Sequence, residues 1–388
     1  MKNKTGITLK IGKEICLWII LTAGFFISPH AVKAQTNKAF PLPFLVIPDT
    51  AHHKALSLQV SNREFVYDAE FFNPLEPGYT LLGFQLQPVI HYRVSSNFDL
   101  TTGIYLLKYS GMDRFVQWRP VLAATYRFNP SFSLTMGTLD GSLHHRLPEP
   151  LYKFDLSLSD NIEEGIQAIL NTTRIRGDYW LDWRSFIQPG DPHQEELAFG
   201  TSTLFSPFPD LSSWTITIPV YSLIFHRGGQ IDQSPLPVHT FGNIAGGVIA
   251  ERNTESSFIH RYGLSFLVFR YFDASGNLLF PFSSGTAVYP KLEVKAGHWS
   301  FSGGYWWANH FFSLTGEPQF ASVSENAPGR YLPDRQLIKM RLGYYRSLAG
   351  GPEFFFFSDG YWDLGRKAFD YSVGLQMIFN HTFDLLDL

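Results

Sequence analysis

The stretch FDYSVGLQMIFN, residues 369–380, decides the fold class. Apolar side chains occupy every second position: Phe369, Tyr371, Val373, Leu375, Met377 and Phe379. Polar or small residues stand between them, with Ile378 as the apolar exception: Asp370, Ser372, Gly374, Gln376 and Asn380. Strict alternation over this length predicts an extended strand with one apolar face and one polar face.

The same alternation recurs along the chain. It is clear in 81–94, 115–128, 213–222, 288–297 and 337–345, and weaker in 55–66, 98–108, 131–138, 162–170, 177–187, 196–206, 242–251, 258–271, 299–312 and 353–363. No long segment with a 3.6-residue period competes with these strands. We therefore expect an all-β fold of about sixteen strands, within a range of roughly 14–18.

Strand and loop lengths indicate where the apolar faces lie. Most segments reach the ~9–11 residues that a tilted strand needs to cross a membrane, whereas strands of soluble proteins most often have about 5–6. Short connections alternate with longer ones at 139–161, 227–241, 272–284 and 313–336. This parity predicts a transmembrane antiparallel up-and-down β-barrel with both termini on one side. The apolar faces then meet lipid, and the polar faces line a water-filled lumen.

Composition agrees with this interpretation. Charged residues make up 17% of the chain, against about 25% in typical soluble domains. Aromatic residues make up 16%, which suits the aromatic girdles of membrane barrels. The net charge of −3 provides no general basic field for nucleic acid, so we expect no nucleic-acid partner.

The N-terminus has the layout of a secretory signal peptide. Four lysines precede an apolar run at 15–27, and AVKAQ (31–35) offers a cleavage site after Ala34. The run is shorter than the ~20 residues of a membrane-spanning helix. We expect a signal peptide at 1–34, a periplasmic lead-in at 35–54, the barrel at 55–383 and a tail at 384–388. The single cysteine, Cys16, lies in the signal peptide, so the mature chain has no disulfide.

The chain resembles porin-like outer-membrane β-barrels of Gram-negative bacteria. The resemblance lies in the signal peptide, the alternating strands, the aromatic girdles and the last strand ending in Phe379 and Phe383. LDGSLHHRLPEPLYKFD (139–155) and YWLDWRSFIQPGDPHQEELAFG (179–200) resemble segments of Bacteroidota outer-membrane proteins. The class implies the outer membrane as location, its lipid and lipopolysaccharide as surroundings, small polar solutes as partners, no cofactor, and a monomer or trimer. The tail DLLDL departs from members that stop at the aromatic residue.

No motif in the sequence indicates catalysis. DGSLHHRLPEP (140–150) contains His144 and His145, which we interpret as part of a polar outer loop. DPHQEE (191–196) allows cation binding or lipopolysaccharide bridging as an alternative to a plain loop. Ser222 and His226 share one strand about 13 Å apart, too far for a hydrogen bond. Nucleotide-binding, serine-hydrolase and zinc-protease motifs are absent from the sequence. We therefore expect no metal site and no enzymatic activity.

The polar faces suggest passive diffusion of small polar solutes. The residues expected to line the pore are Arg93, Arg119, Arg127, Asp182, Arg184, Arg261, Lys291, Glu293, Lys295, Lys339, Arg341, Asp370 and Gln376. Basic residues outnumber acids among them, and small neighbours should leave Lys339 and Arg341 exposed to solute, so we expect a weak anion preference. Pairing with nearby acids is the alternative. A surface receptor, adhesin or assembly component remains open, and a barrel hydrolase ranks behind these. The direction in which loops 139–161 and 313–336 fold separates a constricted pore from a binding surface.

Overall fold

The computed structural model describes residues 55–387, except 210–212, 230, 255, 257, 325–326 and 328. The strands in this part of the chain are β1 (Ala55–Glu70), β2 (Tyr79–Ser95), β3 (Phe98–Tyr109), β4 (Gln117–Asn129), β5 (Phe132–Thr138), β6 (Glu164–Asn171), β7 (Ile175–Ser185), β8 (Glu196–Phe205), β9 (Trp214–Arg227), β10 (His239–Asn253), β11 (Ile259–Asp273), β12 (Ser284–Ala296), β13 (Trp299–Asn309), β14 (Asp334–Ser347), β15 (Glu353–Asp363) and β16 (Ala368–Asp387).

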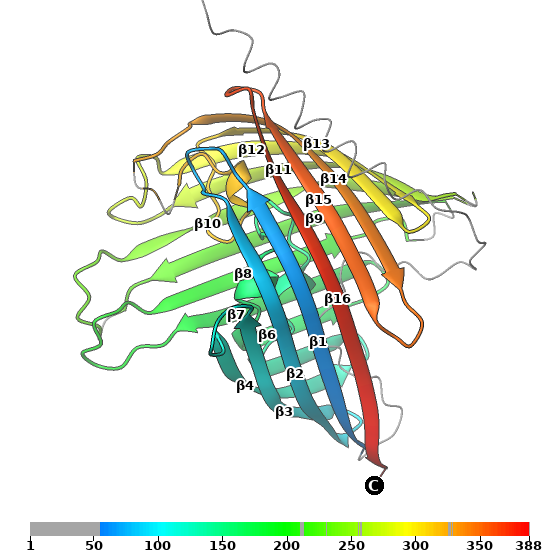
Figure 1. Cartoon of the computed structure of the whole chain (residues 1–388). Coiled ribbons are helices and arrows are strands. Elements are labelled where there is room, and N and C mark those ends of the chain that lie inside the picture. Colours follow the sequence, from blue (N-terminus) through cyan, green and yellow to red (C-terminus); the bar gives the residue numbers. More distant parts are fainter. Residues whose placement is uncertain are drawn as a thin grey trace, which may run out of the picture. The chain divides into compact units, whose positions relative to one another are not determined.

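These strands form a closed antiparallel barrel in which each strand pairs with its neighbours in the chain (Figure 1). Closure comes from β1 and β16, which are paired from Ala55 with Asp387 to Glu70 with Tyr371. Sixteen strands therefore lie in the expected order, and the prediction of an up-and-down barrel is confirmed. Closure gives every strand a partner on both sides, so no strand lies at the edge of the sheet.

The last strand is longer than the sequence predicts. Strand β16 does not end at Phe383 but continues to Asp387, because its last residues pair with the first residues of β1. The expected tail at 384–388 is therefore mostly strand. The expected signal peptide (1–34) and lead-in (35–54) lie outside the described residues.

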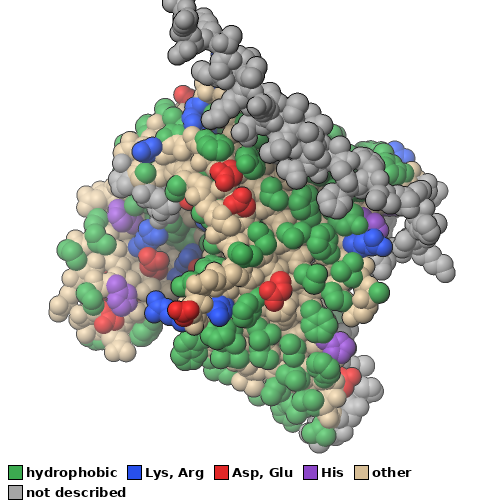
Figure 2. Space-filling model, viewed as in Figure 1, with side chains coloured by type: hydrophobic (Ala, Val, Ile, Leu, Met, Phe, Trp, Pro, Cys, Tyr) green, Lys and Arg blue, Asp and Glu red, His purple; other side chains and the backbone are tan. Residues whose placement is uncertain are grey.

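The two faces of the strands differ as the alternation predicts. On β16 the side chain of Leu375 is 39% exposed on the outside, whereas Gln376 is 1% exposed on the inside. Hydrophobic side chains gather on the outer face formed by β1, β2 and β16 (Figure 2). The outer belt is thus largely apolar, and polar side chains such as Asp370, Ser372 and Gln376 of β16 point into the barrel.

The lumen is occupied by two of the long connections. Loop A (139–163) joins β5 to β6, and loop B (310–324) follows β13; together they are called the plug. The loops bind each other, because Lys153 N donates to Thr315 O at 2.7 Å and Glu317 N donates to Glu149 O at 3.0 Å. The short helices among the described residues are η1 (Ser142–His145) and α2 (Leu156–Ser159) in loop A and η2 (Pro318–Phe320) in loop B. No helix in the described ranges is long and apolar enough to cross a membrane.

Inward side chains of the wall hold the plug. Arg63 Nη1 donates to Ser157 O at 3.0 Å, and Asn243 Nδ2 donates to Phe312 O at 2.7 Å. Arg335 Nη2 donates to Gln319 O at 2.9 Å. Aromatic side chains of the plug pack in the same core as those of the wall: Phe154, Phe311, Phe312 and Phe320 with Phe269, Trp306 and Phe357. Both loops that the sequence left undecided therefore fold inward.

The depth dependence of the apolar belt is testable on β16. Leu375→Arg places a charge in the middle of the belt and should lower the free energy of unfolding by about 2–4 kcal/mol. Leu386→Arg is a matched control, because Leu386 is 53% exposed and pairs with the outward Leu56 of β1 near the strand end. It should cost only about 0–1 kcal/mol. Urea unfolding in lipid vesicles measures both, and equal losses would mean that the belt does not face hydrocarbon.

Candidate active site

The barrel wall is lowest at β5 and β6, which have 7 and 8 residues. Strand β4 pairs with β3 from Gln117 onward but with β5 only from Ala123 onward. Strand β7 pairs with β6 only as far as Asp182. The upper parts of β4 and β7 therefore have no sheet between them, and loop A lies there instead. We call this place the low wall.

Two glycines allow loop A to leave the wall. Gly137 and Gly165 pair directly across β5 and β6. Both have positive φ, 102° and 159°, and a Cβ on either would come within 2.1 Å of a backbone oxygen of the neighbouring strand. A side chain at either position would clash with the neighbouring strand, so the backbone can bend here only because both residues are glycine. Beyond the bend, Gln117 Nε2 donates to Ser159 O at 2.9 Å, which fixes the returning end of loop A against β4.

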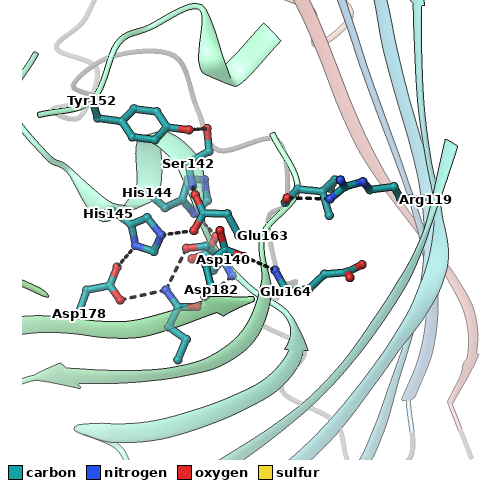
Figure 3. Close-up of polar contacts among 12 residues, drawn as sticks. Arg119, Asp140, Ser142, His144, His145, Tyr152, Glu163, Glu164, Asp178 and Asp182 are labelled. Carbon is teal, nitrogen blue, oxygen red and sulfur yellow. Dashed lines mark hydrogen bonds and ion pairs between the residues drawn. The ribbon is translucent and has the colours of Figure 1, made fainter. Parts of the chain in front are cut away.

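The first turn of loop A carries Asp140, Ser142, His144 and His145, which we call the polar cluster (Figure 3). Its backbone is fixed by one side chain of the wall and one of loop A itself: Asp140 N donates to Gln167 Oε1 at 2.9 Å, and Ser142 N donates to Glu163 Oε1 at 2.8 Å. His145 lies between two carboxylates, with Nε2 2.7 Å from Glu163 Oε2 and Nδ1 2.8 Å from Asp178 Oδ2. The sequence suggested a polar outer loop for this histidine, but the structure buries it inside the barrel.

Protonated His145 holds Glu163 of loop A and Asp178 of β7 together, and we call these three residues the clamp. Its ring stacks on Trp180 with centroids 3.5 Å apart. Burial alone lowers the pKa of His145, but Glu163 and Asp178 outweigh burial and raise this pKa to about 10. Burial alone raises the pKa of Glu163, but the His145 imidazolium holds it below its usual value. His145 is therefore protonated at neutral pH and cannot accept a proton from a nucleophile.

Ser142 is also buried and His144 is half-buried, but their partners differ from those of His145. The carboxylate of Asp140 contacts Nδ1 of His144, which leaves Nε2 as the free nitrogen of this imidazole. The Ser142 hydroxyl accepts a hydrogen bond from Tyr152 Oη at 3.1 Å. Ser142 has φ of 59°, a conformation that is uncommon outside glycine and that concentrates at functional sites. Ser142 and His144 are both described, and no hydrogen bond joins their side chains.

A small cavity adjoins the cluster. It has a volume of about 30 Å³ and lies between the plug, with His145, Tyr152 and Glu163, and the wall, with Trp180 and Asp182. That space accommodates one or two water molecules. The described residues contain no group of three or more His, Cys, Asp or Glu side chains that could hold a metal ion.

The residues expected to line a pore all lie on inward positions of their strands, but the charged ones are bound to other groups of the protein. Lys339 Nζ lies 2.6 Å from Glu149 Oε2 of loop A, and Arg341 Nε donates to Asp359 Oδ1 at 2.6 Å. The other cations bind as follows: Arg93 and Arg127 with Asp99, Arg119 with Ile162 O, Arg184 with Asp160, Arg261 with Glu251, and Lys291 and Lys295 with Glu293. Among the others, Asp370 accepts from Phe72 N and Asp182 from Glu164 N, while Gln376 is buried.

Burial corrects one expectation about these cations. Lys339 and Arg341 were expected to be open to passing solute, but they are 2% and 7% exposed because Glu149 of loop A covers them. The sequence also missed Glu163, Asp178 and Tyr152 as partners of the cluster. Only the inward folding of loop A brings them together, and no local spacing signals it.

Comparison with known proteins places the chain in a family. The profile of the family described as Lipid A 3'-O-deacylase-type matches residues 48–388, which is the whole barrel. The chain belongs to this family. No curated protein matches the chain significantly.

Solved structures show the same fold. The barrel is similar to a loop-L8 deletion variant of OmpT, an outer membrane protein of Vibrio cholerae, with TM-score 0.52, 11% identity, and coverage of 84% of this chain and 100% of that chain. It is also similar to OccK1 (OpdK) of Pseudomonas aeruginosa, with TM-score 0.50, 9% identity, and coverage of 86% and 100%. At these identities the likeness shows the fold, a porin-like barrel of the outer membrane.

Family membership overturns one expectation. The sequence motifs suggested that the chain is not an enzyme, but the family that covers its barrel is an enzyme family. That expectation is wrong. It rested on the absence of local motifs, whereas the polar cluster is held together by partners from loop A, β6 and β7.

The clamp predicts a pH-dependent stability. The pKa of His145 is raised, so its contribution is complete below about pH 6.5 and is lost as the pH rises through about 10. His145→Gln should lower the free energy of unfolding by about 3–5 kcal/mol at pH 6, and the difference from wild type should shrink towards pH 10. Urea unfolding at several pH values measures this. His193→Gln, in the exposed loop 186–195, is the control. A difference that does not change with pH would contradict the clamp.

Proposed function

We propose that this protein is an outer-membrane hydrolase that removes an ester-linked acyl chain from lipid A, with loop A at the low wall as its active site. Family membership supports the substrate class. The geometry supports the site, because the polar cluster lies where the sheet is lowest. The long loops, including loop A, are taken to face the cell exterior, as in other outer-membrane barrels.

The low wall is the observation that carries this proposal. Strands β5 and β6 have 7 and 8 residues, fewer than the ~9–11 that span the membrane. Loop A therefore begins at a depth where the other strands still face lipid. The acyl esters of lipid A lie at the boundary between sugar headgroup and hydrocarbon. A lipid can thus approach the start of loop A from the side, without passing through the lumen.

The cluster contains the groups that acyl transfer needs. The Ser142 hydroxyl oxygen attacks the ester carbonyl, and Nε2 of His144 accepts the hydroxyl proton. Asp140, on Nδ1, orients the ring and stabilises the imidazolium that forms. His144 then returns the proton to the departing sugar hydroxyl, and a water molecule hydrolyses the acyl-serine. For the first step the Ser142 hydroxyl turns from Tyr152 towards His144.

Tyr152 supplies a hydrogen-bond donor for the developing oxyanion. Burial raises the pKa of Tyr152 well above its usual value, so its hydroxyl stays protonated. It donates to Ser142 at 3.1 Å, and it becomes available to the oxyanion once the Ser142 hydroxyl turns towards His144. A donor this close to the reacting oxygen can stabilise the negative charge of the tetrahedral intermediate.

Substitution of the two reacting side chains tests this function. Ser142→Ala should lower the deacylation rate by about 10³-fold or more, and His144→Gln by about 10²–10⁴-fold. Mass spectrometry of lipid A from cells that produce each variant shows whether an acyl chain is lost. Ser256→Ala and His193→Gln, at exposed positions outside the cluster, are the controls.

Two results would contradict the proposal. One is that the wild-type protein leaves the mass of lipid A unchanged. The other is that Ser142→Ala and His144→Gln release acyl chains as fast as the controls, while all variants keep the heat-dependent gel shift of a folded barrel.

A second candidate function is the passive conduit for small polar solutes suggested by the sequence. The inward polar residues favour it, since Arg93, Asp99 and Arg127 form an ion cluster on the inner wall near the short turns. Glu149 is the obstacle, because it ties loop A to Lys339 and Arg341. Solute then passes only when the plug moves.

This conduit is testable in planar bilayers. Glu149→Gln removes the tie between loop A and the wall, so the frequency of open states and the preference for anions in a KCl gradient should both rise. Glu293→Gln is the control, since the ion pairs that Glu293 forms within the described residues are with Lys291 and Lys295 of its own strand. Equal conductance of wild type and both variants would remove the conduit from consideration.

A further inference from the structure

The outer belt carries a carboxylate in the middle of β1. Strand β1 turns its even-numbered residues outward, since Arg63 and Phe65 are buried inside the barrel and Glu64 is exposed. Glu64 pairs with Met377 on β16 and with Phe84 on β2. Among the described residues it accepts a hydrogen bond from Asn62, whose Nδ2 donates to Glu64 Oε1 at 3.3 Å.

Glu64 stands among apolar side chains. Val66, Met377 and Leu375 are exposed on the same face. Acidic side chains are few on this side of the molecule, where hydrophobic ones predominate (Figure 2). An ionisable group at this depth is costly in hydrocarbon, and such groups normally face a protein partner.

A cation of the same barrel lies on the same row. Phe84 pairs with Lys108 on β3, so Glu64, Phe84 and Lys108 follow one another across three adjacent strands. Lys108 also points outward, because Leu107 beside it is buried. Strands are spaced about 4.8 Å apart, which puts Glu64 and Lys108 about 10 Å from each other. Within the described residues neither side chain forms an ion pair.

We propose that the face formed by β16, β1, β2 and β3 is an interface between copies of this chain, in which Glu64 of one copy pairs with Lys108 of the next. Opposite charges that flank β2 are complementary to the same surface on a second copy. In a two-fold contact the pair forms twice, and in a closed ring it forms once at each contact. The apolar residues between the charges, Leu82 and Phe84, then pack against their counterparts.

Charge exchange tests the contact. Glu64→Lys and Lys108→Glu should each convert the oligomer to monomer, because like charges then face each other. The double exchange Glu64→Lys/Lys108→Glu should restore the oligomer. Native mass spectrometry in mild detergent gives the number of copies, and the heat-dependent gel shift confirms that each variant is folded.

Cross-linking provides a second measurement. The full chain with Cys16→Ser, Glu64→Cys and Lys108→Cys should give disulfide-linked oligomers in isolated outer membranes. The matched control places cysteines at Ile244 and Val268, which are exposed outward on β10 and β11. Monomeric wild type, cross-linking no stronger than in the control, or single exchanges that leave the oligomer intact would overturn the interface.

Discussion

The structure depends on the pairing of inward polar side chains of the wall with the backbone and carboxylates of the plug. An inward Arg63 or Arg335 without a partner would be costly once the lumen is closed to water. Ser157 O and Gln319 O provide those partners. The alternation that makes the outside apolar also makes the inside polar, so a barrel whose lumen is filled needs loops with matching donors and acceptors.

The plug in turn explains the position of the polar cluster. Loop A leaves the sheet at Gly137, where the wall is low, and its returning end is held by Gln117. Between these points loop A is held inside the lumen, because Glu149 is bound to Lys339 on the opposite wall. The same anchoring that closes the lumen therefore holds Ser142 and His144 beside the low wall, where the proposed function needs them. The closed lumen fits a family of lipid-modifying enzymes better than an open pore.

The barrel itself was predictable from the sequence, because alternation with a period of two is a local signal. Leu375 and Gln376 could be assigned to opposite faces from their positions alone, and the structure agrees. The alternation of short and long connections is also readable in the sequence, and it predicted the up-and-down order of the strands.

The candidate site was not predictable in this way. His145 meets Asp178 33 positions away, and Lys339 meets Glu149 across most of the barrel. These contacts depend on whether a loop folds into the lumen, which is decided by the sum of many long-range pairings and leaves no periodic trace. Asp140 and His144 are only four positions apart, but in an extended loop that spacing does not bring their side chains together. It does so only because the chain turns through the short helix η1.

Hydrogen–deuterium exchange of the plug tests the central claim most directly. In native outer-membrane vesicles, the amides of Lys153 and Glu317, which bridge the two loops, should be protected for hours, as are those of the strands. The amides of His193 and Gln194, in the loop 186–195, provide the fast reference in the same sample. Exchange of Lys153 and Glu317 within seconds, at the rate of that loop, would mean that the plug does not fill the lumen, and the account of the active site built on it would fail.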